Sequence, residues 1–316
     1  MSKKALVTGG AGFIGNRLVD ALLERDYEVA VLDILKRGNK LDPESLRRTE
    51  FVEGDVRDEA TVDRLVRGCD YVFHLAAVLG VDIVADNPVE TMHTETVGLA
   101  NVANACMRHA VRNLVYASTS GVYGKAAIEQ AVDEEFDVMP NSSYSIAKRY
   151  NEIYLKSLWQ EKRLPSVSIR YFNVYGPKQD DRMVIPRFIQ QALADAPITV
   201  YGTGEQTRDF TYLDDVVEAT VRLAENCRSC EVVNVSHGHE LTIHALAQRI
   251  KALTGSASEI KLINMPKGRY DLEVNRRVGD STKLHRLIGE RPTTDLETGL
   301  GQTLDLFMAR NGKGGR

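Results

Sequence analysis

Thr8-Gly9-Gly10-Ala11-Gly12-Phe13-Ile14-Gly15 is the segment of this chain that most clearly predicts its fold. The apolar run at residues 4–7 predicts a short buried strand before it, and apolar residues at helical spacing predict a helix over residues 16–25 after it. A glycine-rich turn between a strand and a helix lets backbone N–H groups approach a pyrophosphate, and the helix N-terminus adds positive potential. Gly9, Gly12 and Gly15 therefore predict a turn that binds a dinucleotide.

An acidic residue follows the turn at the distance expected for a ribose-binding group. A second predicted strand over residues 28–32 ends in Asp33, 18 residues after Gly15. A carboxylate there would bind the ribose hydroxyls and repel a 2′-phosphate, so the sequence favours NAD over NADP. Lys36 and Arg37 lie close by in the chain and leave NADP open, because a cation can accommodate the extra phosphate.

Strands and helices alternate along the first half of the chain. Predicted strands at residues 51–52, 71–75, 113–117 and 166–171 are separated by predicted helices, of which the longest spans residues 88–109. Such alternation predicts a Rossmann-type, doubly wound parallel α/β sheet with helices on both faces. Ligands bind at the carboxyl ends of such strands, where the sequence places Asp55, Ala76, Ala77, Thr119 and Asn173.

The pattern changes after Asn173, where the polar loop at residues 176–181 predicts a boundary. We expect residues 1–172 to form the dinucleotide-binding domain, with a segment near 209–237 that includes a strand returning to the main sheet. Residues 173–316 are expected to form mainly a smaller substrate-binding lobe.

Tyr144 and Lys148 form a Tyr-x-x-x-Lys step, and Thr119 lies upstream. Residues four apart share a face of a helix, so the Lys148 ammonium can lie beside the Tyr144 phenol and favour the phenolate. Bringing a tyrosine pKa from ~10 to ~7 needs about 4 kcal/mol, which a close ammonium in a partly dry site can supply. Together a phenol, an ammonium and a hydroxyl can move a proton on and off an alcohol.

Composition excludes several other classes of protein. The net charge of −4 gives no reason to expect binding to nucleic acid or to a membrane surface, and no apolar run approaches a bilayer-spanning length. No metal-ligand pattern is complete around Cys227 and Cys230, so no metal is expected. No signal peptide is evident, which predicts a cytoplasmic protein.

Seven ordered motifs resemble the extended short-chain dehydrogenase/reductase superfamily, in its nucleotide-sugar epimerase and dehydratase branch. They are Thr8–Gly15, Gly54-Asp55-Val56, His74-Leu75-Ala76-Ala77, Ala117–Gly124, Tyr144-x-x-x-Lys148, Arg170–Pro177 and Arg208–Asp215. The resemblance covers nearly the whole chain and is nearest to UDP-glucose 4-epimerase-like enzymes. It implies a nucleotide-sugar substrate and a homodimer formed through helices near Leu99 and Tyr144.

The resemblance also implies a role for each matching residue. Tyr144 would be the general acid and base, Thr119 would bind the reacting hydroxyl, and Lys148 would lower the Tyr144 pKa and bind the nicotinamide ribose. Asn173, Arg208 and Arg269 would bind the substrate pyrophosphate, although the spacing around Arg269 departs from the family pattern. The remaining cofactor contacts would be made by Phe13, Ile14, Asp33, Asp55, Val56, Leu75, Ala76, Ala77 and Phe172. His74 is expected to be structural.

The reaction type depends on the residues after Thr119. Dehydratases and decarboxylases of the family usually carry extra acidic residues there, whereas this chain has Ser120 and Gly121. That difference favours a 4-epimerase, which oxidises the sugar at C4 and returns the hydride to the other face. A keto-sugar reductase, a dehydratase and a 3,5-epimerase stay open, and a non-catalytic NAD-binding regulator is a remote alternative.

Two departures from the family concern the sugar and the cofactor. Gly80, Ile83 and Val84 stand where epimerases often place polar residues that contact substrate, and Glu95 stands where the family commonly has Asn. A buried acid beside the cofactor needs a partner or a raised pKa. Glu95 could be structural, or it could shape the electrostatics of the site.

Overall fold

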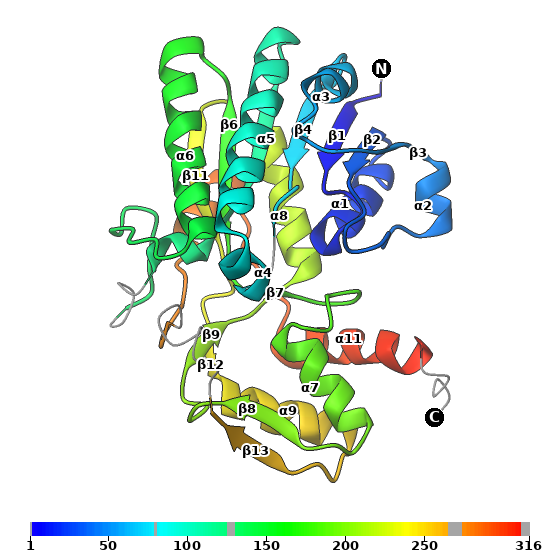
Figure 1. Ribbon diagram of the computed structural model, residues 1–316, viewed down its shortest axis with the longest axis vertical. Coiled ribbons are helices and arrows are strands. Elements are labelled where there is room, and N and C mark those ends of the chain that lie inside the picture. Colours follow the sequence, from blue (N-terminus) through cyan, green and yellow to red (C-terminus); the bar gives the residue numbers. More distant parts are fainter. Residues whose placement is uncertain (1, 79–80, 125–129, 265–273, 311–316) are drawn as a thin grey trace.

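A computed structural model describes residues 2–78, 81–124, 130–264 and 274–310 (Figure 1). Its centre is a seven-stranded sheet in which every neighbouring pair is parallel. In spatial order the strands are β3 (Thr49–Glu53), β2 (Glu28–Asp33), β1 (Lys4–Thr8), β4 (Tyr71–His74), β5 (Asn113–Thr119), β6 (Ser166–Tyr171) and β11 (Cys230–Val235). The predicted Rossmann-type α/β fold is therefore confirmed.

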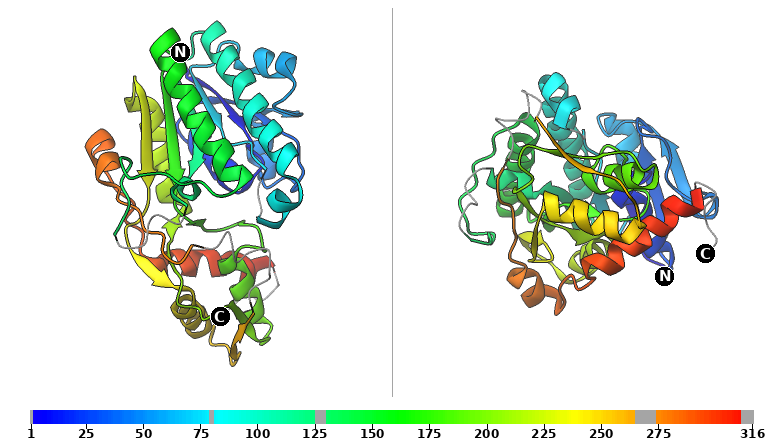
Figure 2. Two further views of the ribbon diagram at one scale, coloured as in Figure 1. Left: turned by 60° about the vertical axis from the view of Figure 1, so that its left-hand side comes forward. Right: turned by 90° about the horizontal axis from the view of Figure 1, so that it is seen from below.

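Helices cover both faces of the sheet (Figure 2). One face packs against α1 (Phe13–Leu23), α8 (Leu213–Asn226) and α10 (Thr282–Ile288), and the other against α3 (Glu59–Val66), α5 (Pro88–Arg108) and α6 (Ser143–Lys162). Side chains of β1 alternate between these two cores: Ala5 and Val7 enter the first, and Leu6 enters the second. Because both faces of the sheet are buried, its inner strands appear in the sequence as mainly apolar segments.

A smaller lobe lies beyond the carboxyl ends of the central strands, in the lower part of Figure 1. Its core is formed by α7 (Val184–Leu193), α9 (Ile243–Thr254) and α11 (Leu296–Arg310) with the parallel strands β8 (Ile198–Tyr201) and β13 (Ile260–Ile263). Two small strand pairs also lie in this half of the chain: β7 (Val174–Tyr175) with β10 (Thr211–Tyr212), and β9 (Thr207–Asp209) with β12 (Glu240–Thr242).

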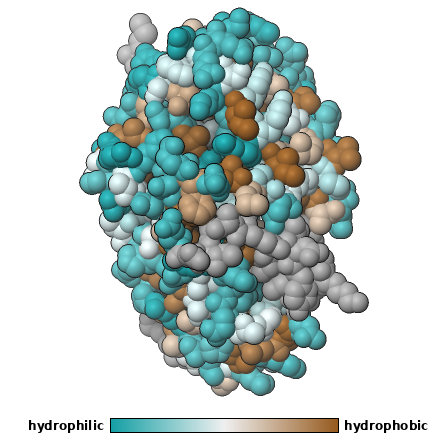
Figure 3. Space-filling model, turned by 90° about the vertical axis from the view of Figure 1, so that its left-hand side faces the viewer, coloured by the Kyte–Doolittle hydropathy of each residue, from teal (hydrophilic) through white to brown (hydrophobic). Residues whose placement is uncertain are grey.

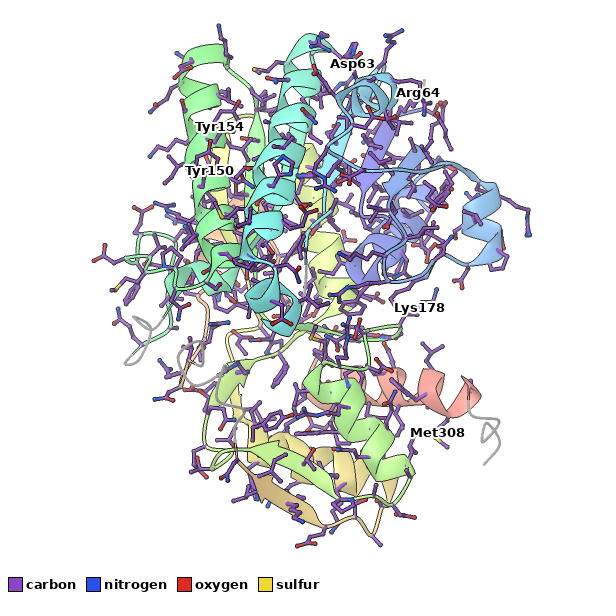
Figure 4. The ribbon with its side chains drawn as sticks, viewed as in Figure 1. Asp63, Arg64, Tyr150, Tyr154, Lys178 and Met308 are labelled. Atoms are coloured by element: carbon purple, nitrogen blue, oxygen red, sulfur yellow. The ribbon has the colours of Figure 1, made fainter. Side chains whose placement is uncertain are left out.

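The chain passes between the sheet and the lobe more than once. After β6 it enters the lobe, and it returns through α8 to β11, which pairs with β6 along six residues of register. Lys178, labelled in Figure 4 at the junction, donates to the backbone oxygen of Lys40 and pairs with Asp42. The lobe is thus tied to the sheet by both covalent and polar connections.

Several short elements were not predicted from the sequence, among them α2 (Pro43–Arg47), α4 (Val81–Asp86) and the 3₁₀ helix η1 (Ser120–Tyr123). Each of these three is six residues or shorter, too short to show a helical period. In the described part of the chain, no helix has the length and apolar character needed to cross a bilayer.

Candidate active site

Two adjoining cavities lie at the carboxyl ends of the central strands. The smaller, of about 280 Å³, is lined by residues that follow β2, β3 and β4, and the larger, of about 600 Å³, extends towards the lobe. Both are lined by Gly9, Gly12, Leu75 and Ala77, so the two form one continuous site. This is the position at which doubly wound sheets bind ligands.

The glycine turn forms the floor of the site and leaves no room for side chains. Gly9 has a φ of +71°, and a Cβ atom there would lie 2.7 Å from the Ala76 nitrogen. A Cβ atom on Gly15 would lie 2.2 Å from the Gly9 oxygen. Gly12 is the N-cap of α1, and no side chain caps that helix end. The turn therefore presents bare backbone at a helix N-terminus, which fits a pyrophosphate.

Asp33 and Asp55 lie along the smaller cavity. The Asp33 carboxylate accepts hydrogen bonds from the backbone N–H of Ala11 at 3.0 Å and of Leu35 at 2.8 Å. Burial raises the pKa of Asp33, and these two donors oppose the rise. Asp55 instead pairs with the Arg57 guanidinium at 2.6 Å, which holds its pKa below the ordinary value. The structure thus orients both carboxylates at this end of the site.

Apolar residues line the remainder of the cofactor side. Val56 and Ala76 line the smaller cavity, while Phe13 and Ile14 line the larger one. Of the sequence-predicted cofactor residues, only Phe172 lies elsewhere. It is fully buried in a cluster with Val122, Tyr123 and Val132.

Phe172, expected beside the nicotinamide, lines neither cavity, and its contact with the cofactor stays a prediction. Its neighbours Tyr171 and Asn173 line the larger cavity, whereas Phe172 does not. Strand β6 ends at Tyr171, and Asn173 has a positive φ of 26°, so the chain turns here and strand alternation does not set these orientations. The ring of Phe172 packs 6.1 Å from that of Tyr123. The Phe172 ring therefore supports the cavity wall from the interior of the protein.

The first turn of α6 positions Tyr144 and Lys148. Ser142 and Ser145 form a capping box that fixes where the helix begins, and the two functional side chains lie one turn apart in the larger cavity. Thr119 is the last residue of β5; its side chain accepts a hydrogen bond from the backbone N–H of Gly121 and lines the same cavity as Tyr144. The three residues predicted from spacing therefore meet at one point.

The electrostatics around Tyr144 differ from the expectation of an acidified phenol. Burial raises the pKa of Tyr144, the carboxylate of Glu95 adds to the rise, and the Thr119 side chain only partly opposes it. The Lys148 ammonium lies 5.4 Å from the centre of the Tyr144 ring, but it is paired with Glu95 at 2.9 Å. The carboxylate of Glu95 thus lies against the ammonium that was expected to favour the phenolate.

His74 occupies the core beneath the site. Its Nδ1 lies 2.7 Å from the Thr8 hydroxyl, and its ring stacks on Tyr116. Burial lowers the pKa of His74 to about 3, and the nearby Lys148 contributes to the shift. A histidine that stays neutral in this way is suited to a packing role.

Two of the predicted substrate-binding residues line the larger cavity beside the lobe. The Asn173 side chain donates to the Asp209 backbone oxygen at 3.0 Å, and Arg208 donates to the backbone oxygens of Thr207 and Val274 at 2.7 Å each. Backbone contacts of this kind hold both side chains at the wall of the cavity. Arg269 lies outside the described residues.

Comparison with known proteins identifies the family. The family model described as "NAD dependent epimerase/dehydratase family" matches residues 5–236, which include the glycine turn, Thr119, Tyr144 and Lys148. The chain belongs to this family. The resemblance inferred from the sequence motifs is thereby confirmed.

Individual relatives of the family carry different activities in their names. A UDP-N-acetyl-alpha-D-glucosaminuronate decarboxylase from Bacillus cytotoxicus is 34% identical and covers 97% of this chain and 98% of the relative. The solved UDP-glucose 4-epimerase from Thermotoga maritima with UDP-glucose is 33% identical, with a TM-score of 0.91 and coverage of 98% of this chain and 99% of that chain.

NAD is the cofactor of this family member. The UDP-glucose 4-epimerase from Thermus thermophilus, solved with NAD, is 32% identical with a TM-score of 0.87, and covers 96% of this chain and 98% of that chain. Together with the family model and the fit of the glycine turn, this confirms the predicted cofactor. Among the described residues, no cluster of three or more His, Cys, Asp or Glu is placed to hold a metal ion.

The larger cavity is also lined by residues that were not predicted from the sequence: Arg182, Arg187, Gln206 and Arg277. Arg187 lies in the first turn of α7, with its guanidinium over the Tyr201 ring at 4.8 Å. All three arginines come from the lobe half of the chain, so the wall opposite the sheet is rich in cations. Single arginines separated by irregular loops give no periodic signal, which is why the sequence did not identify them.

Proposed function

We propose that this protein is a nucleotide-sugar 4-epimerase that acts on a UDP-sugar by transient oxidation at C4. The observation that carries the proposal is the composition of the site at the end of β5. Thr119 supplies a hydroxyl and Tyr144 supplies a phenol. The two residues that follow Thr119 in the chain are Ser120 and Gly121. Elimination of water would need a further acid and base there, and neither residue can serve as one.

Tyr144 is proposed to exchange the proton of the sugar C4 hydroxyl. As the C4 hydrogen leaves as a hydride, the hydroxyl proton passes to the Tyr144 oxygen and a 4-keto sugar forms. Bound oxidised NAD would accept and later return that hydride, and its positive charge would favour the phenolate. When the hydride returns to the other face, Tyr144 gives the proton back. Thr119 would hold the reacting oxygen through its hydroxyl.

The remainder of the substrate is proposed to lie against the lobe. Asn173 and Arg208 lie at the cavity wall, and Arg269 is proposed to join them as the second arginine for the pyrophosphate. Binding energy from the diphosphate and the base would let the sugar turn without being released. The two orientations of the sugar would then reach the same Tyr144 oxygen.

The test is to incubate the purified protein with UDP-, GDP- and dTDP-sugars and to identify the products by NMR. We expect inversion at C4 of a UDP-sugar with no net change in NADH absorbance over many turnovers. Net oxidation or reduction of the cofactor would instead indicate the reductase, and loss of the C6 hydroxyl would indicate the dehydratase.

Decarboxylation is the second candidate, because a relative with nearly full coverage is named as a decarboxylase. That reaction would start with the same oxidation at C4 and would then release CO₂ from a sugar carrying a C6 carboxylate. The NMR panel therefore includes a UDP-uronic acid. Loss of its C6 signal with formation of a pentose would replace the epimerase assignment.

A further inference from the structure

Glu95 and Lys148 form an ion pair that is closed off from solvent. The distance between Glu95 Oε2 and Lys148 Nζ is 2.9 Å, and the exposed fractions of the two side chains are 0% and 1%. Glu95 comes from α5 and Lys148 from α6, two helices that pack side by side on one face of the sheet. The pair therefore depends on tertiary packing, and α6 alone could not form it.

Each polar contact of Glu95 holds its carboxylate in this position. The backbone N–H of Val78 donates to Oε1 at 3.3 Å. Asn151 donates to the Glu95 backbone oxygen and to the Tyr116 hydroxyl. Glu95, which lies on α5, is thus held by α6 and by the segment after β4.

The other titratable groups around the pair leave it electrically isolated. His74, at the end of β4, stays neutral because burial lowers its pKa to about 3. Tyr116 of β5 and Tyr144 of α6 both have pKa values raised by burial, so both keep their protons. Glu152, farther along α6, is already matched by Arg170 at 2.8 Å. Lys148 and Glu95 are therefore the charged pair that packs against Tyr144 from α5 and α6, while Arg182, Arg187, Arg208 and Arg277 line the same cavity from the lobe half of the chain.

The net charge of the pair decides what Tyr144 experiences. If the proton lies on Lys148 the pair is a cation and an anion, and if it lies on Glu95 the pair is two neutral groups. In both states the pair sums to zero. A buried ammonium without a partner would favour the phenolate, because opposite charges attract strongly in a dry site. The carboxylate removes most of that effect.

We propose that Glu95 is a positioning residue of the acid–base site, which holds the Lys148 ammonium between Tyr116 and Tyr144 and cancels its charge at the Tyr144 hydroxyl. The ammonium lies 4.7 Å from the Tyr116 ring centre and 5.4 Å from that of Tyr144. The catalytic meaning of this inference rests on the proposed function, since Tyr144 would then release its proton mainly in response to a charged ligand. The proposed cancellation of the Lys148 charge by Glu95 involves only side chains of this protein and no substrate.

The experiment is an ultraviolet titration of the Tyr144 phenol in the full-length protein, both as purified and after saturation with NAD. Each protein is compared with the same protein carrying Tyr144→Phe, so that the difference isolates one tyrosine among twelve. We expect Glu95→Gln to lower the midpoint of that difference by about one pH unit or more, a roughly tenfold change in proton affinity. The variant leaves the Lys148 ammonium uncompensated.

Two controls separate charge from other effects of substitution. Glu95→Asp keeps the negative charge and should keep the midpoint near that of the wild type. Glu161→Gln removes the same charge from an exposed position 13 residues beyond Lys148 on α6, about 20 Å away, and should not move it. If Glu95→Gln does not fold by circular dichroism, Glu95→Asn takes its place with the same expected shift.

Three results would overturn the inference. They are an unchanged or raised midpoint in the neutral variant, an equal shift in Glu95→Asp, and failure of both neutral variants to fold, which would make Glu95 a residue of the fold alone. No substrate is present in the titration. The result of the titration therefore does not depend on whether the NMR panel finds a 4-epimerase. If the protein is an active epimerase and Glu95→Gln leaves the Tyr144 midpoint unchanged, the role of Glu95 is rejected and the proposed function is not.

Discussion

Among the individual residues, Tyr144 carries the hydroxyl on which the proposed chemistry depends. Removing it in Tyr144→Phe should lower turnover by about 1,000-fold or more, since both proton transfers use this oxygen. The ring stays in place, so folding and NAD binding should be retained. Steady-state rates measured by NMR, with calorimetry for NAD, check this.

Tyr150→Phe is the matched control, because it removes a hydroxyl from an exposed tyrosine on the same helix. Its rate should equal that of the wild type. A Tyr144→Phe protein with near-normal turnover would show that another group serves as the base.

Asp33 is expected to set the preference between the two dinucleotides. Asp33→Asn keeps an oxygen for one of the two backbone donors, Ala11 and Leu35, and removes the charge. We expect the affinity for NAD to fall about tenfold, because a hydrogen bond to a charged acceptor is worth about 1.5–3 kcal/mol. Affinity for NADP should change less, since the repulsion of its 2′-phosphate is relieved. Titration calorimetry with both dinucleotides measures this, and an unchanged ratio of affinities would exclude the role.

Individual site residues were predictable from sequence where the signal is local. Thr119, Tyr144 and Lys148 follow a strand end and a four-residue helical step, and the structure brings them together. The partner of Lys148 was not predictable, because Glu95 lies on another helix and only the packing of α5 against α6 brings it within 2.9 Å. The orientation of Phe172 depends on which side of the chain faces the cavity after β6, and the sequence alone does not fix that.

Among the elements beside the site, β9 carries Asp209, which connects this strand to the loop after β11 and to the segment around Gly279. Its carboxylate accepts hydrogen bonds from the backbone N–H groups of His237, Gly238 and Gly279. Burial nevertheless raises its pKa from 3.8 to about 6. The three donors reduce the cost of the charge, but they do not cancel the loss of water.

This carboxyl should make the stability of the protein depend on pH. Its folded pKa lies above the unfolded value, so the folded state binds the proton more tightly, and the stability due to this group decreases as pH rises from about 4 to about 6. The free energy of unfolding of the wild type, relative to Asp209→Asn, should fall by up to about 3 kcal/mol across that window.

Urea denaturation of the wild type and Asp209→Asn at several pH values measures the difference. The variant loses at least one backbone hydrogen bond at every pH, so only the slope with pH carries the prediction. A flat or rising difference would show that the carboxyl is already ionised in the folded protein at pH 4.

The long helices were predictable from the sequence and the pairing of the short strands in the lobe was not, for a physical reason. The helix predicted over residues 88–109 is α5 (Pro88–Arg108), because its apolar period repeats over five turns. Strands β8 and β13 have four residues each, and their pairing joins segments about 60 positions apart. Nothing local in the sequence specifies such a pairing.

At the scale of the whole molecule, we propose that two copies of the chain associate through α5 and α6. Ile146, Tyr150 and Ile153 lie four and three residues apart on α6 and are 46%, 51% and 54% exposed. Tyr150 also stacks on Tyr154, and Figure 4 labels both on this helix. Brown hydrophobic side chains are visible on the upper half of this face in Figure 3. Exposed apolar side chains on one helix face suit a subunit contact.

Light scattering after size-exclusion chromatography should give a mass near twice 35.1 kDa for the wild type. Ile153→Glu would place a charge in the contact and should give the single-chain mass. Leu253→Glu makes the same kind of change at a 43% exposed position on α9 and should leave the larger mass intact. A wild type that elutes at the single-chain mass would reject the association.

The pairing of β11 with β6 has a consequence for how the protein can be made. Every side chain of β6 is buried, and its outer neighbour is supplied only by residues 230–235. A nascent chain that has emerged as far as residue 172 therefore carries a strand whose outer backbone edge is unpaired, which is a recognised hazard for aggregation.

We expect a fragment ending at residue 172 to be insoluble or rapidly digested by trypsin, whereas the full chain resists digestion. A soluble, protease-resistant fragment would contradict this. The ribosome must add roughly sixty more residues before residues 230–235 can cover that edge, so synthesis of the full chain, and not of its first half, completes the sheet.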